Sequence, residues 1–367
     1  MKKRILFVSN TAWSIANFRV NLMKKLAENG FEIVALTPTD DFKKNIPFQH
    51  YDINMSNRGT NPLADTILFF KFLRLFKKID PDLIMSFTIK PNIYGTIAAN
   101  ILKIPIVVNV AGLGSTFRKS NFVSWVTRNL YNYSLPKASC IFFQNEDDLK
   151  IIKRSVSLSK VQVGLLPGSG VDINKFKPQK KEISENFKFL MLGRFLKEKG
   201  IGEYVKAGAE LKQIHKNLEI QLLGFVNVEN PSAITKSEID KWQNKGFINY
   251  LGSTDDVRKY IAKADCIVLP SYYGEGVPRS LLEAASMGKP IITTDNVGCK
   301  EVVQNSINGL ICRKRDYYDL KEKMLQMIKL SEQERYEMGQ KGREIVEKRF
   351  DENIVLRKNI KVINKLI

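Results

Sequence analysis

Short apolar, β-branched runs alternate with segments of helical periodicity along most of this 367-residue chain. Between the first two runs, Phe18, Leu22 and Leu26 recur every fourth residue and Gly30 follows, which predicts one helix ending at this glycine. Strands this apolar, separated by helices, are typical of parallel sheets that helices cover on both faces. In the first half of the chain we predict strands at 5–9, 33–37, 83–87, 106–110 and 140–143.

A second series of apolar runs predicts strands at 189–192, 219–223, 267–269 and 291–293, again with helices between them. Two such series predict an α/β protein of two Rossmann-like, doubly wound domains. Ligands bind beyond the carboxyl ends of strands in such sheets, so we expect the two domains to face each other across a cleft that holds the site.

The segment between the two series is rich in glycine, proline and polar residues, as a linker is. The chain end reads as a last helix after Asp351, which we expect to cross back to the first domain. The predicted division is a first domain at 1–165, a linker at 166–186, a second domain at 187–349 and the final helix at 350–367.

The lengths of the apolar runs and the pattern of cysteines indicate the cellular compartment of the protein. No apolar run approaches the roughly 18 residues that would span a bilayer. The start, "MKKRILFVSN", has only Ile5–Val8 as an apolar core, too short for a secretory signal. The four cysteines are scattered and form no CxxC pair, which favours buried reduced thiols. We therefore expect a cytoplasmic protein.

The net charge of +20 calls for an explanation. Residues 1–165 hold 23 Lys and Arg against 11 Asp and Glu, so the first half is strongly basic. Such a balance favours anionic partners: phosphate esters, anionic lipid or nucleic acid. The alternative is a compositional bias that merely covers the surface with solvated lysines.

The stretch "SYYGEGVPRSLLEAASMGKP", residues 271–290, carries two glutamates eight positions apart, Glu275 and Glu283. It follows a predicted strand, and Pro278 suits the first turn of the helix that comes next. The loop-to-helix junction at Gly276, Val277 and Pro278 would then offer free backbone N–H groups, together with the positive end of the helix dipole, to a phosphate. A carboxylate can accept two hydrogen bonds from a vicinal diol, so Glu283 suits a ribose and Glu275 suits hydroxyls beyond the phosphates.

A second loop, in "FLMLGRFLKEKG", places Arg194 and Lys199 after the strand at 189–192. Arginine offers forked donors to phosphate oxygens and lysine adds a point charge, each such bond contributing roughly 1.5–3 kcal/mol. Together the two side chains could stabilise a diphosphate leaving group. Taken singly, each is as consistent with an ordinary surface residue.

These pieces in this order, with "GKPIITTDNVGCKEVV" after them and "GSGVDINKFKP" at the domain crossover, resemble family 4 glycosyltransferases over nearly the whole chain. The resemblance implies a retaining enzyme of the GT-B fold that uses a nucleotide sugar. Glu283 would hold the ribose, Glu275 the donor sugar, and Arg194 and Lys199 the diphosphate. Glu275, Arg194 and Lys199 are thus the candidate catalytic residues.

More narrowly, "SNRGTNP", "FTIKPNIYG" and "GLGSTF" resemble bacterial enzymes that extend polyprenyl-diphosphate-linked glycans, some of which transfer N-acetylgalactosamine. This resemblance implies a UDP-sugar donor, with N-acetylgalactosamine or another N-acetylhexosamine as the first candidate. Gly112 and Gly114 would let the backbone approach the donor sugar, although an ordinary turn explains them equally well.

The chain departs from its relatives near the acceptor. Many relatives carry a histidine in the first domain, whereas this chain has only His50 and His215, for which we expect structural or surface roles. Ile89 stands where some relatives have histidine, which makes Lys90 the obvious polar group. Side chains replace a glycine pair in "SNTAWSIANFR". The candidate acceptor-binding residues are Lys90, Arg58, Asn10, Trp13, Arg19 and Arg118.

No cluster of His, Asp or Glu has metal-ligand spacing, so we expect neither a metal nor another cofactor. Two basic, aromatic segments, 66–78 and 115–137, bear on the membrane. Basic amphipathic helices with aromatics suit an anionic bilayer surface, which would place the protein peripherally on the inner face of the plasma membrane. For 66–78 the alternative is a helix that packs its apolar side on the sheet and leaves its basic side in water.

Two other functions remain to be compared. A sugar-nucleotide epimerase could share the fold but would need its own acid–base residues and no acceptor. A basic nucleic-acid-binding protein would explain the charge but not the two glutamates, and no recognition module is present. We therefore expect no nucleic-acid partner.

Overall fold

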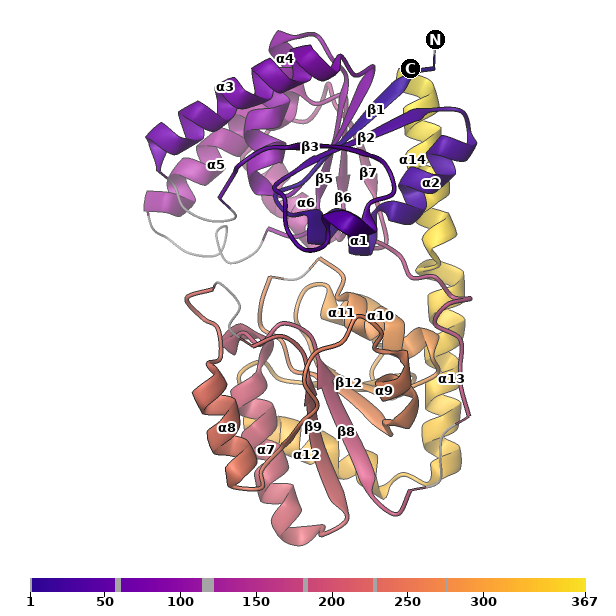
Figure 1. Ribbon diagram of the computed structural model, residues 1–367. Coiled ribbons are helices and arrows are strands. Elements are labelled where there is room, and N and C mark those ends of the chain that lie inside the picture. Colours follow the sequence, from indigo (N-terminus) through magenta and orange to yellow (C-terminus); the bar gives the residue numbers. More distant parts are fainter. Residues whose placement is uncertain (1, 57–60, 114–121, 181–183, 227–229, 275) are drawn as a thin grey trace. The chain divides into compact units, whose positions relative to one another are not determined.

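The computed structural model describes residues 2–56, 61–113, 122–180, 184–226, 230–274 and 276–367 (Figure 1). The chain forms two compact units, one of Met1–Ser169 with Asn353–Ile367 and one of Gly170–Glu352. Each unit is built on a parallel β-sheet with helices on both faces. The predicted fold class, two Rossmann-like α/β domains, is confirmed.

The first unit contains a seven-stranded sheet of order β3-β2-β1-β4-β5-β6-β7, parallel throughout. The five strands predicted from the sequence are present, with bounds that differ by one residue at most. The two edge strands are more polar and half-exposed, so their pattern is weaker. The strands are β1 Arg4–Val8, β2 Glu32–Thr37, β3 Gln49–Asp52, β4 Leu83–Phe87, β5 Ile106–Val110, β6 Cys140–Phe143 and β7 Gln162–Leu165.

Successive side chains of β1 point to opposite faces of this sheet, and each face has its own buried core. Leu6 and Val8 belong to the cluster under α3, α4 and α5, whereas Ile5 and Phe7 belong to the cluster under α1, α2 and α14. The helices are α1 Ala12–Phe18, α2 Val20–Glu28, α3 Pro62–Ile79, α4 Thr96–Ile101, α5 Phe122–Ser134, α6 Glu146–Lys153 and α14 Glu352–Leu366. Short turns are η1 Lys43–Asn45, the π-helical η2 Pro91–Gly95 and η3 Leu135–Lys137.

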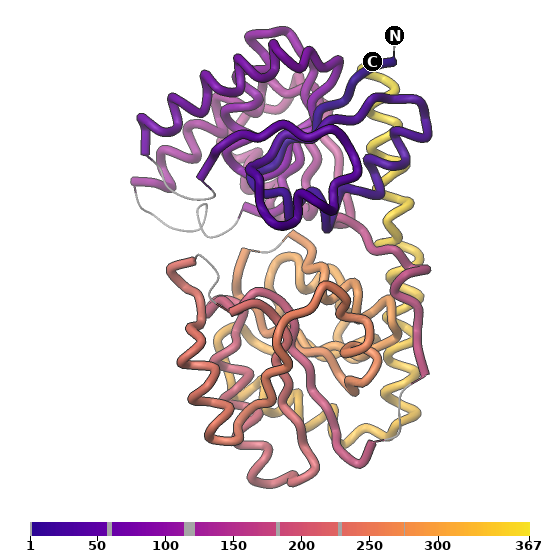
Figure 2. Tube along the Cα trace, in the orientation of Figure 1, coloured from indigo at the N-terminus to yellow at the C-terminus, as the bar shows by residue number. Residues whose placement is uncertain are grey.

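The prediction of one helix before Gly30 is wrong, because the helix breaks at Arg19, whose φ of −127° and ψ of −14° separate α1 from α2. The final helix, α14, packs on the first unit (Figure 2), and its residues Val355, Val362 and Ile363 are buried in the same core cluster as Ile5 and Phe7 of β1. The last residues of the chain therefore complete the core of the first unit.

The second unit contains a six-stranded parallel sheet of order β10-β9-β8-β11-β12-β13. Its strands are β8 Phe187–Leu192, β9 Leu218–Leu223, β10 Asn249–Tyr250, β11 Cys266–Leu269, β12 Ile291–Thr294 and β13 Gly309–Cys312. Its helices are η4 Lys197–Lys199, α7 Ile201–Ile214, α8 Lys236–Asn244, α9 Arg258–Lys263, α10 Arg279–Ser286, α11 Cys299–Val302, α12 Tyr317–Lys329 and α13 Glu332–Arg349. The strand order reverses between β8 and β11, so this sheet has its topological switch point there.

The four cysteines are buried and unpaired, as predicted. His50 lies on edge strand β3, where its Nε2 is 2.9 Å from Thr37 Oγ1, and burial lowers the pKa of its imidazole. His215 caps the end of α7. Across the described ranges, we find no helix that combines the length and the apolar character needed to cross a bilayer.

Candidate functional site

Two loops lie together at the switch point of the second unit. One follows β8 and carries Arg194 and Lys199, and the other follows β11. The backbone N–H of Tyr272 donates to the carbonyl of Glu198 at 2.8 Å, and the Ser271 hydroxyl donates to the same carbonyl at 3.3 Å. The two segments that the sequence predicts at one sheet edge are therefore hydrogen-bonded neighbours.

A glycine is required where these loops meet. Gly200 has a φ of +79°, and a Cβ on it would lie 2.3 Å from the carbonyl oxygen of Pro270. Such a contact is far inside van der Waals distance, and the left-handed backbone is itself unfavourable for other residues. Gly200 therefore lets the β8 loop pass directly against the β11 loop.

Buried polar side chains of β12 and of the turn after it hydrogen-bond to the end of β11 and to the loop that follows. The Thr293 hydroxyl donates to the Leu269 carbonyl at 2.7 Å, and the Thr294 hydroxyl donates to the Ser271 carbonyl. The Asn296 amide donates to the Tyr273 carbonyl. These bonds join β12 and the turn after it to every second carbonyl from the end of β11 to Tyr273, and so they constrain the loop as far as Tyr273.

Arg194 and Lys199, both in the loop after β8, differ in how far they are exposed to solvent. Arg194 is exposed, and its guanidinium makes neither a hydrogen bond nor an ion pair with any residue that the structure describes. Lys199 is the last residue of η4 and is half-buried. An exposed arginine and a half-buried lysine at one strand end suit an anion that approaches from solvent.

Helix α10 follows the β11 loop and begins without a side-chain cap at its N-cap residue. Pro278 is its N-cap residue, with φ −64° and ψ 119°, rather than the first-turn residue that the sequence predicts. Gly276, Val277 and Pro278 are buried, so the turn packs closely on the sheet. Proline has no side-chain donor or acceptor with which to cap this helix, and the positive end of a helix dipole favours an anion.

Glu283 lies on the fifth residue of α10 and is paired within its own helix. Its Oε1 is 3.0 Å from Arg279 Nε, and the side chains of the two residues are 14% and 20% exposed. Burial raises the pKa of Glu283 above its ordinary value, while Arg279 and Lys175 oppose this increase. A poorly hydrated carboxylate that is only partly compensated gains by accepting hydrogen bonds from a ligand.

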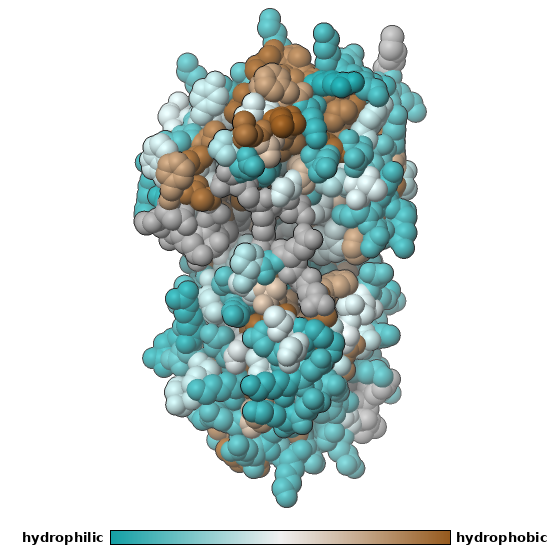
Figure 3. Space-filling model, turned by 60° about the vertical axis from the view of Figure 1, so that its left-hand side comes forward, coloured by the Kyte–Doolittle hydropathy of each residue, from teal (hydrophilic) through white to brown (hydrophobic). Residues whose placement is uncertain are grey.

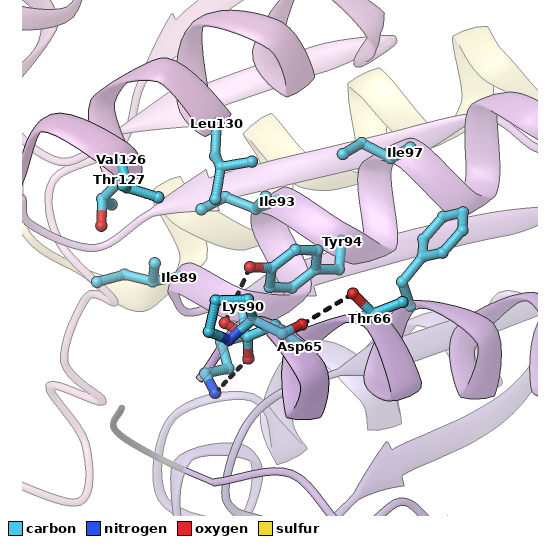
Figure 4. Close-up of a pocket in the computed structure, with 12 residues that line it drawn as sticks. Asp65, Thr66, Ile89, Lys90, Ile93, Tyr94, Ile97, Val126, Thr127 and Leu130 are labelled. Atoms are coloured by element: carbon cyan, nitrogen blue, oxygen red, sulfur yellow. Dashed lines mark hydrogen bonds and ion pairs between the residues drawn. The ribbon is translucent and has the colours of Figure 1, made fainter. Parts of the chain in front are cut away.

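One of the predicted acceptor-binding residues, Lys90, forms a largely buried ion pair within the first unit (Figure 4). Lys90 Nζ is 2.7 Å from Asp65 Oδ1, and the Tyr94 hydroxyl donates to Asp65 Oδ2 at 3.0 Å. The side chains of Lys90 and Asp65 are 14% and 11% exposed. Lys90 is therefore already paired with a carboxylate of this protein. A ligand that contacts Lys90 would meet a lysine that is in an ion pair with Asp65.

The first strand–helix junction of this unit is also occupied by its own side chains. Asp40 Oδ2 accepts hydrogen bonds from the N–H groups of Ala12 and Trp13, and Thr11 caps α1 through Ser14 N. The backbone N–H of Asn10 donates to Thr88 Oγ1. Because Asp40 covers the start of α1, an anion cannot bind there without displacing a carboxylate.

The comparison with known proteins matches both units. Residues 172–345 match the family described as "Glycosyl transferases group 1", and residues 4–145 match "Glycosyl transferase 4-like". Both matches are to glycosyltransferase families, and the chain is a glycosyltransferase. The two switch-point loops and α10 fall inside the first match, and the Lys90–Asp65 pair falls inside the second.

This glycosyltransferase resembles curated enzymes along its whole length. It is 29% identical over 384 residues, 99% of either chain, to the N,N'-diacetylbacillosaminyl-diphospho-undecaprenol alpha-1,3-N-acetylgalactosaminyltransferase of Campylobacter jejuni. It is 25% identical over 308 residues, 74% of this chain and 78% of the relative, to the UDP-Gal:alpha-D-GlcNAc-diphosphoundecaprenol alpha-1,3-galactosyltransferase of Escherichia coli.

Solved structures agree on the fold of this glycosyltransferase. The crystal structure of Anabaena HepE in complex with UDP and glucose superposes with a TM-score of 0.79 at 19% identity, over 98% of this chain and 99% of that one. Sucrose-phosphate synthase from Thermosynechococcus elongatus gives a TM-score of 0.82 at 18% identity, over 100% and 99%. The GT-B fold is therefore confirmed.

Four of the predicted site residues of this glycosyltransferase, Glu275, Gly114, Arg58 and Arg118, lie outside the described residues.

Gly112 has a φ of +123° just after β5, a conformation that favours glycine. Trp13 packs edge-on to Phe18, with ring centroids 5.0 Å apart. Arg19 is only 6% exposed, and its guanidinium lies 4.4 Å above the ring of Phe87. Their roles in binding stay predictions.

Three polar residues were missed by sequence reasoning. Arg279 could have been found, because it stands four residues before Glu283 on a predicted helix, the spacing of an ion pair. Asp65 and Asp40 gave no such signal, because Lys90 and the start of α1 reach them only through the tertiary fold. In the residues that the structure covers, no three His, Cys, Asp or Glu side chains gather as metal ligands would.

Proposed function

We propose that this glycosyltransferase moves a sugar from a UDP-sugar to a polyprenyl-diphosphate-linked saccharide, with retention of anomeric configuration, in the assembly of a bacterial surface or protein-linked glycan. The observation that carries the proposal is the full-length similarity to the Campylobacter jejuni N-acetylgalactosaminyltransferase. N-acetylgalactosamine, or another N-acetylhexosamine, is the sugar that this similarity favours.

The geometry of the second unit supports a donor site at the switch point. Glu283 would accept hydrogen bonds from the two ribose hydroxyls, and Glu275 would bind the hydroxyls of the sugar. Arg194, Lys199 and the first turn of α10 would face the diphosphate. UDP appears with the Anabaena HepE neighbour, which supports a uridine diphosphate donor in this fold.

The reaction that these residues favour is departure and attack on one face of the sugar. The bond between the anomeric carbon and the diphosphate oxygen breaks, and the acceptor oxygen forms its bond on the same face. The acceptor's proton passes to the departing diphosphate. Arg194, Lys199 and the α10 N–H groups act on the negative charge that develops there, the usual largest contribution to such catalysis.

The proposal includes activity without a metal ion, because Arg194, Lys199 and the positive end of a helix would neutralise charge on the diphosphate. This part is tested with chelator in the assay. An activity that collapses in chelator and returns with magnesium or manganese would contradict it.

The acceptor's lipid places the proposed site of action at the inner face of the plasma membrane. The outer surface of α3 and α5 supports this location. Leu63, Ile67 and Phe70 on α3 are at least half exposed, as are Phe122 and Trp125 on α5. In Figure 3 apolar surface gathers over the part of the first unit that these helices form. Basic side chains follow on α3, namely Lys71, Arg74, Lys77 and Lys78.

The test of the proposed donor is direct titration with UDP and with a panel of UDP-sugars, followed by UDP release from each in chelator. We expect UDP to bind and one UDP-N-acetylhexosamine to be consumed only when a prenyl-diphosphate-linked saccharide is present. Turnover of a sugar nucleotide to its epimer without acceptor would instead support an epimerase.

A further inference from the structure

An apolar cavity of about 440 Å³ lies in the first unit between α3, α5 and the segment that runs from Ile89 into α4. Ile89, Ile93 and Ile97 recur every fourth residue along that segment and form one wall (Figure 4). Phe69 of α3 and Val126 and Leu130 of α5 line it from the sides. The volume is within the range of roughly 300–1,000 Å³ typical of small-molecule sites.

The five polar side chains that line this cavity all have partners within the chain. Asp65 binds both Lys90 and Tyr94, and the ion pair leaves no net charge. The hydroxyls of Thr66 and Thr127 each donate, at 2.8 Å, to the carbonyl four residues earlier in their own helices. A ligand therefore meets an essentially apolar surface, and an uncharged hydrocarbon chain fits it better than any polar group.

The surroundings of the cavity indicate where such a chain comes from. Both flanking helices begin at the carboxyl edge of the sheet and expose apolar side chains there, Leu63 and Ile67 on α3 and Phe122 and Trp125 on α5. Within α3 and α5 the only acidic residue is Asp65, which Lys90 neutralises, whereas the two helices carry five basic residues: Lys71, Arg74, Lys77, Lys78 and Arg128. This combination is complementary to a lipid with an anionic head.

We propose that this cavity holds the first isoprene units of the acceptor's prenyl chain. The inference rests on the proposed function, because it assigns a place to one part of that acceptor. The cavity begins at Lys90, just beyond the carboxyl end of β4, where the acceptor's diphosphate is expected. The chain passes from there between α3 and α5 toward the exposed apolar side chains. The cavity thus lets the enzyme select a prenyl lipid from the other lipids of the bilayer.

The test uses farnesyl diphosphate with a photoreactive diazirine in the terminal unit and maps labelled peptides by mass spectrometry. We expect label on 89–97 and 122–134, and we expect undecaprenyl phosphate to compete for it. Val126→Trp, which fills the cavity, should reduce the labelling at least about tenfold, because each buried methylene contributes roughly fourfold to affinity. Asn129→Trp places the same side chain on the exposed side of α5 and should leave the labelling unchanged.

A second measurement separates this inference from the proposed function. Val126→Trp should raise KM for a prenyl-linked acceptor and leave the kinetics of the same saccharide diphosphate on a short alkyl chain unchanged. Thermal melting checks folding, and Leu130→Phe, one turn further along α5, repeats the comparison if Val126→Trp does not fold.

Three results would be decisive against the prenyl site or the proposed reaction. Unchanged labelling in a folded Val126→Trp protein would overturn the cavity's role. Competition by phosphatidylglycerol as strong as that by undecaprenyl phosphate would show an acyl-chain site instead. Specific labelling without transfer to any prenyl-linked acceptor would leave the prenyl site intact and refute the proposed reaction.

Discussion

At the scale of single residues, the environment of Glu283 leads to a prediction about pH. Its carboxylate is partly buried beside Arg279, and burial raises its pKa. We expect Glu283→Gln to weaken UDP binding roughly tenfold, the cost of replacing a charged acceptor. Glu337→Gln, on exposed α13, should change nothing. Titration calorimetry with UDP measures both.

The raised pKa also fixes the direction of the pH effect. As pH falls, Glu283 is protonated at a higher pH than an exposed glutamate, whose pKa is about 4.3, and UDP affinity should fall. Folding responds in the opposite sense, because a group whose pKa is higher in the folded state favours folding as it takes up its proton. The loss of affinity would thus not reflect unfolding. A Glu283→Gln protein that keeps the same pH dependence would contradict this assignment.

The Lys90–Asp65 pair supports a prediction about stability. Asp65→Asn leaves the Lys90 ammonium nearly buried without its anion, which should cost about 3–5 kcal/mol in the free energy of unfolding of the first unit. Asp65→Asn combined with Lys90→Met should cost clearly less. Urea unfolding is followed by tryptophan fluorescence. With Trp242→Phe in all variants, the remaining tryptophans, Trp13 and Trp125, both belong to the first unit, so the signal reports the unfolding of that unit. Equal losses in the single and double variants would contradict the pair's role.

At the scale of elements, the meeting of the β8 and β11 loops depends on Gly200. Gly200→Ala should reduce UDP affinity and destabilise the second unit by about 1–3 kcal/mol, because the methyl group meets Pro270 and the backbone is left-handed. At Gly202, within α7, an added Cβ would meet no neighbouring atom within 4 Å. Gly202→Ala is the matched control and should bind UDP normally; a Gly200→Ala protein that does the same would refute the constraint.

The outer face of α3 gives a prediction about membranes. Changing Lys71, Arg74 and Lys77 to Glu should reduce flotation with phosphatidylglycerol vesicles more than about a hundredfold, since each such charge contributes roughly 1 kcal/mol. The same reversal at Lys216, Lys329 and Lys348, exposed residues of the second unit, is the control. UDP binding should be normal in both proteins. Flotation that the α3 changes leave intact would show that this helix does not carry the contact.

The sequence interpretation of 66–78 as a helix with an apolar inner side and a basic outer side is right only for the second half of α3. Leu68, Phe72 and Phe76 do pack on the sheet, but Leu63, Ile67 and Phe70 lie on the outer face. Periodicity could not separate the two sets, because apolar residues on both sides of a helix weaken the 3.6-residue pattern. Only the structure shows that the outer face of α3 is apolar in the first half of the helix and basic in the second half.

At the scale of the whole molecule, the sheets were predictable because buried parallel strands are nearly continuous apolar runs, as in Leu83–Phe87 and Ile106–Val110, each with one polar residue. That the β8 and β11 loops are neighbours was predictable, because the chain order places Arg194, Lys199 and Glu283 after adjacent strands of one sheet. The partners Asp65 and Asp40, and the cavity between α3 and α5, depend on packing between distant segments. No local pattern in the sequence records such packing.

The mass of the lipid product is the sharpest test of the proposed transfer. The enzyme would be incubated with a UDP-N-acetylhexosamine and a polyprenyl-diphosphate-linked saccharide in chelator, and the lipid fraction analysed by mass spectrometry. We expect a gain of one N-acetylhexosamine on the lipid-linked saccharide, in the same anomeric configuration as in the donor. An unchanged lipid-linked acceptor beside a folded, UDP-binding protein, across the panel of donors and acceptors, would contradict the proposed function.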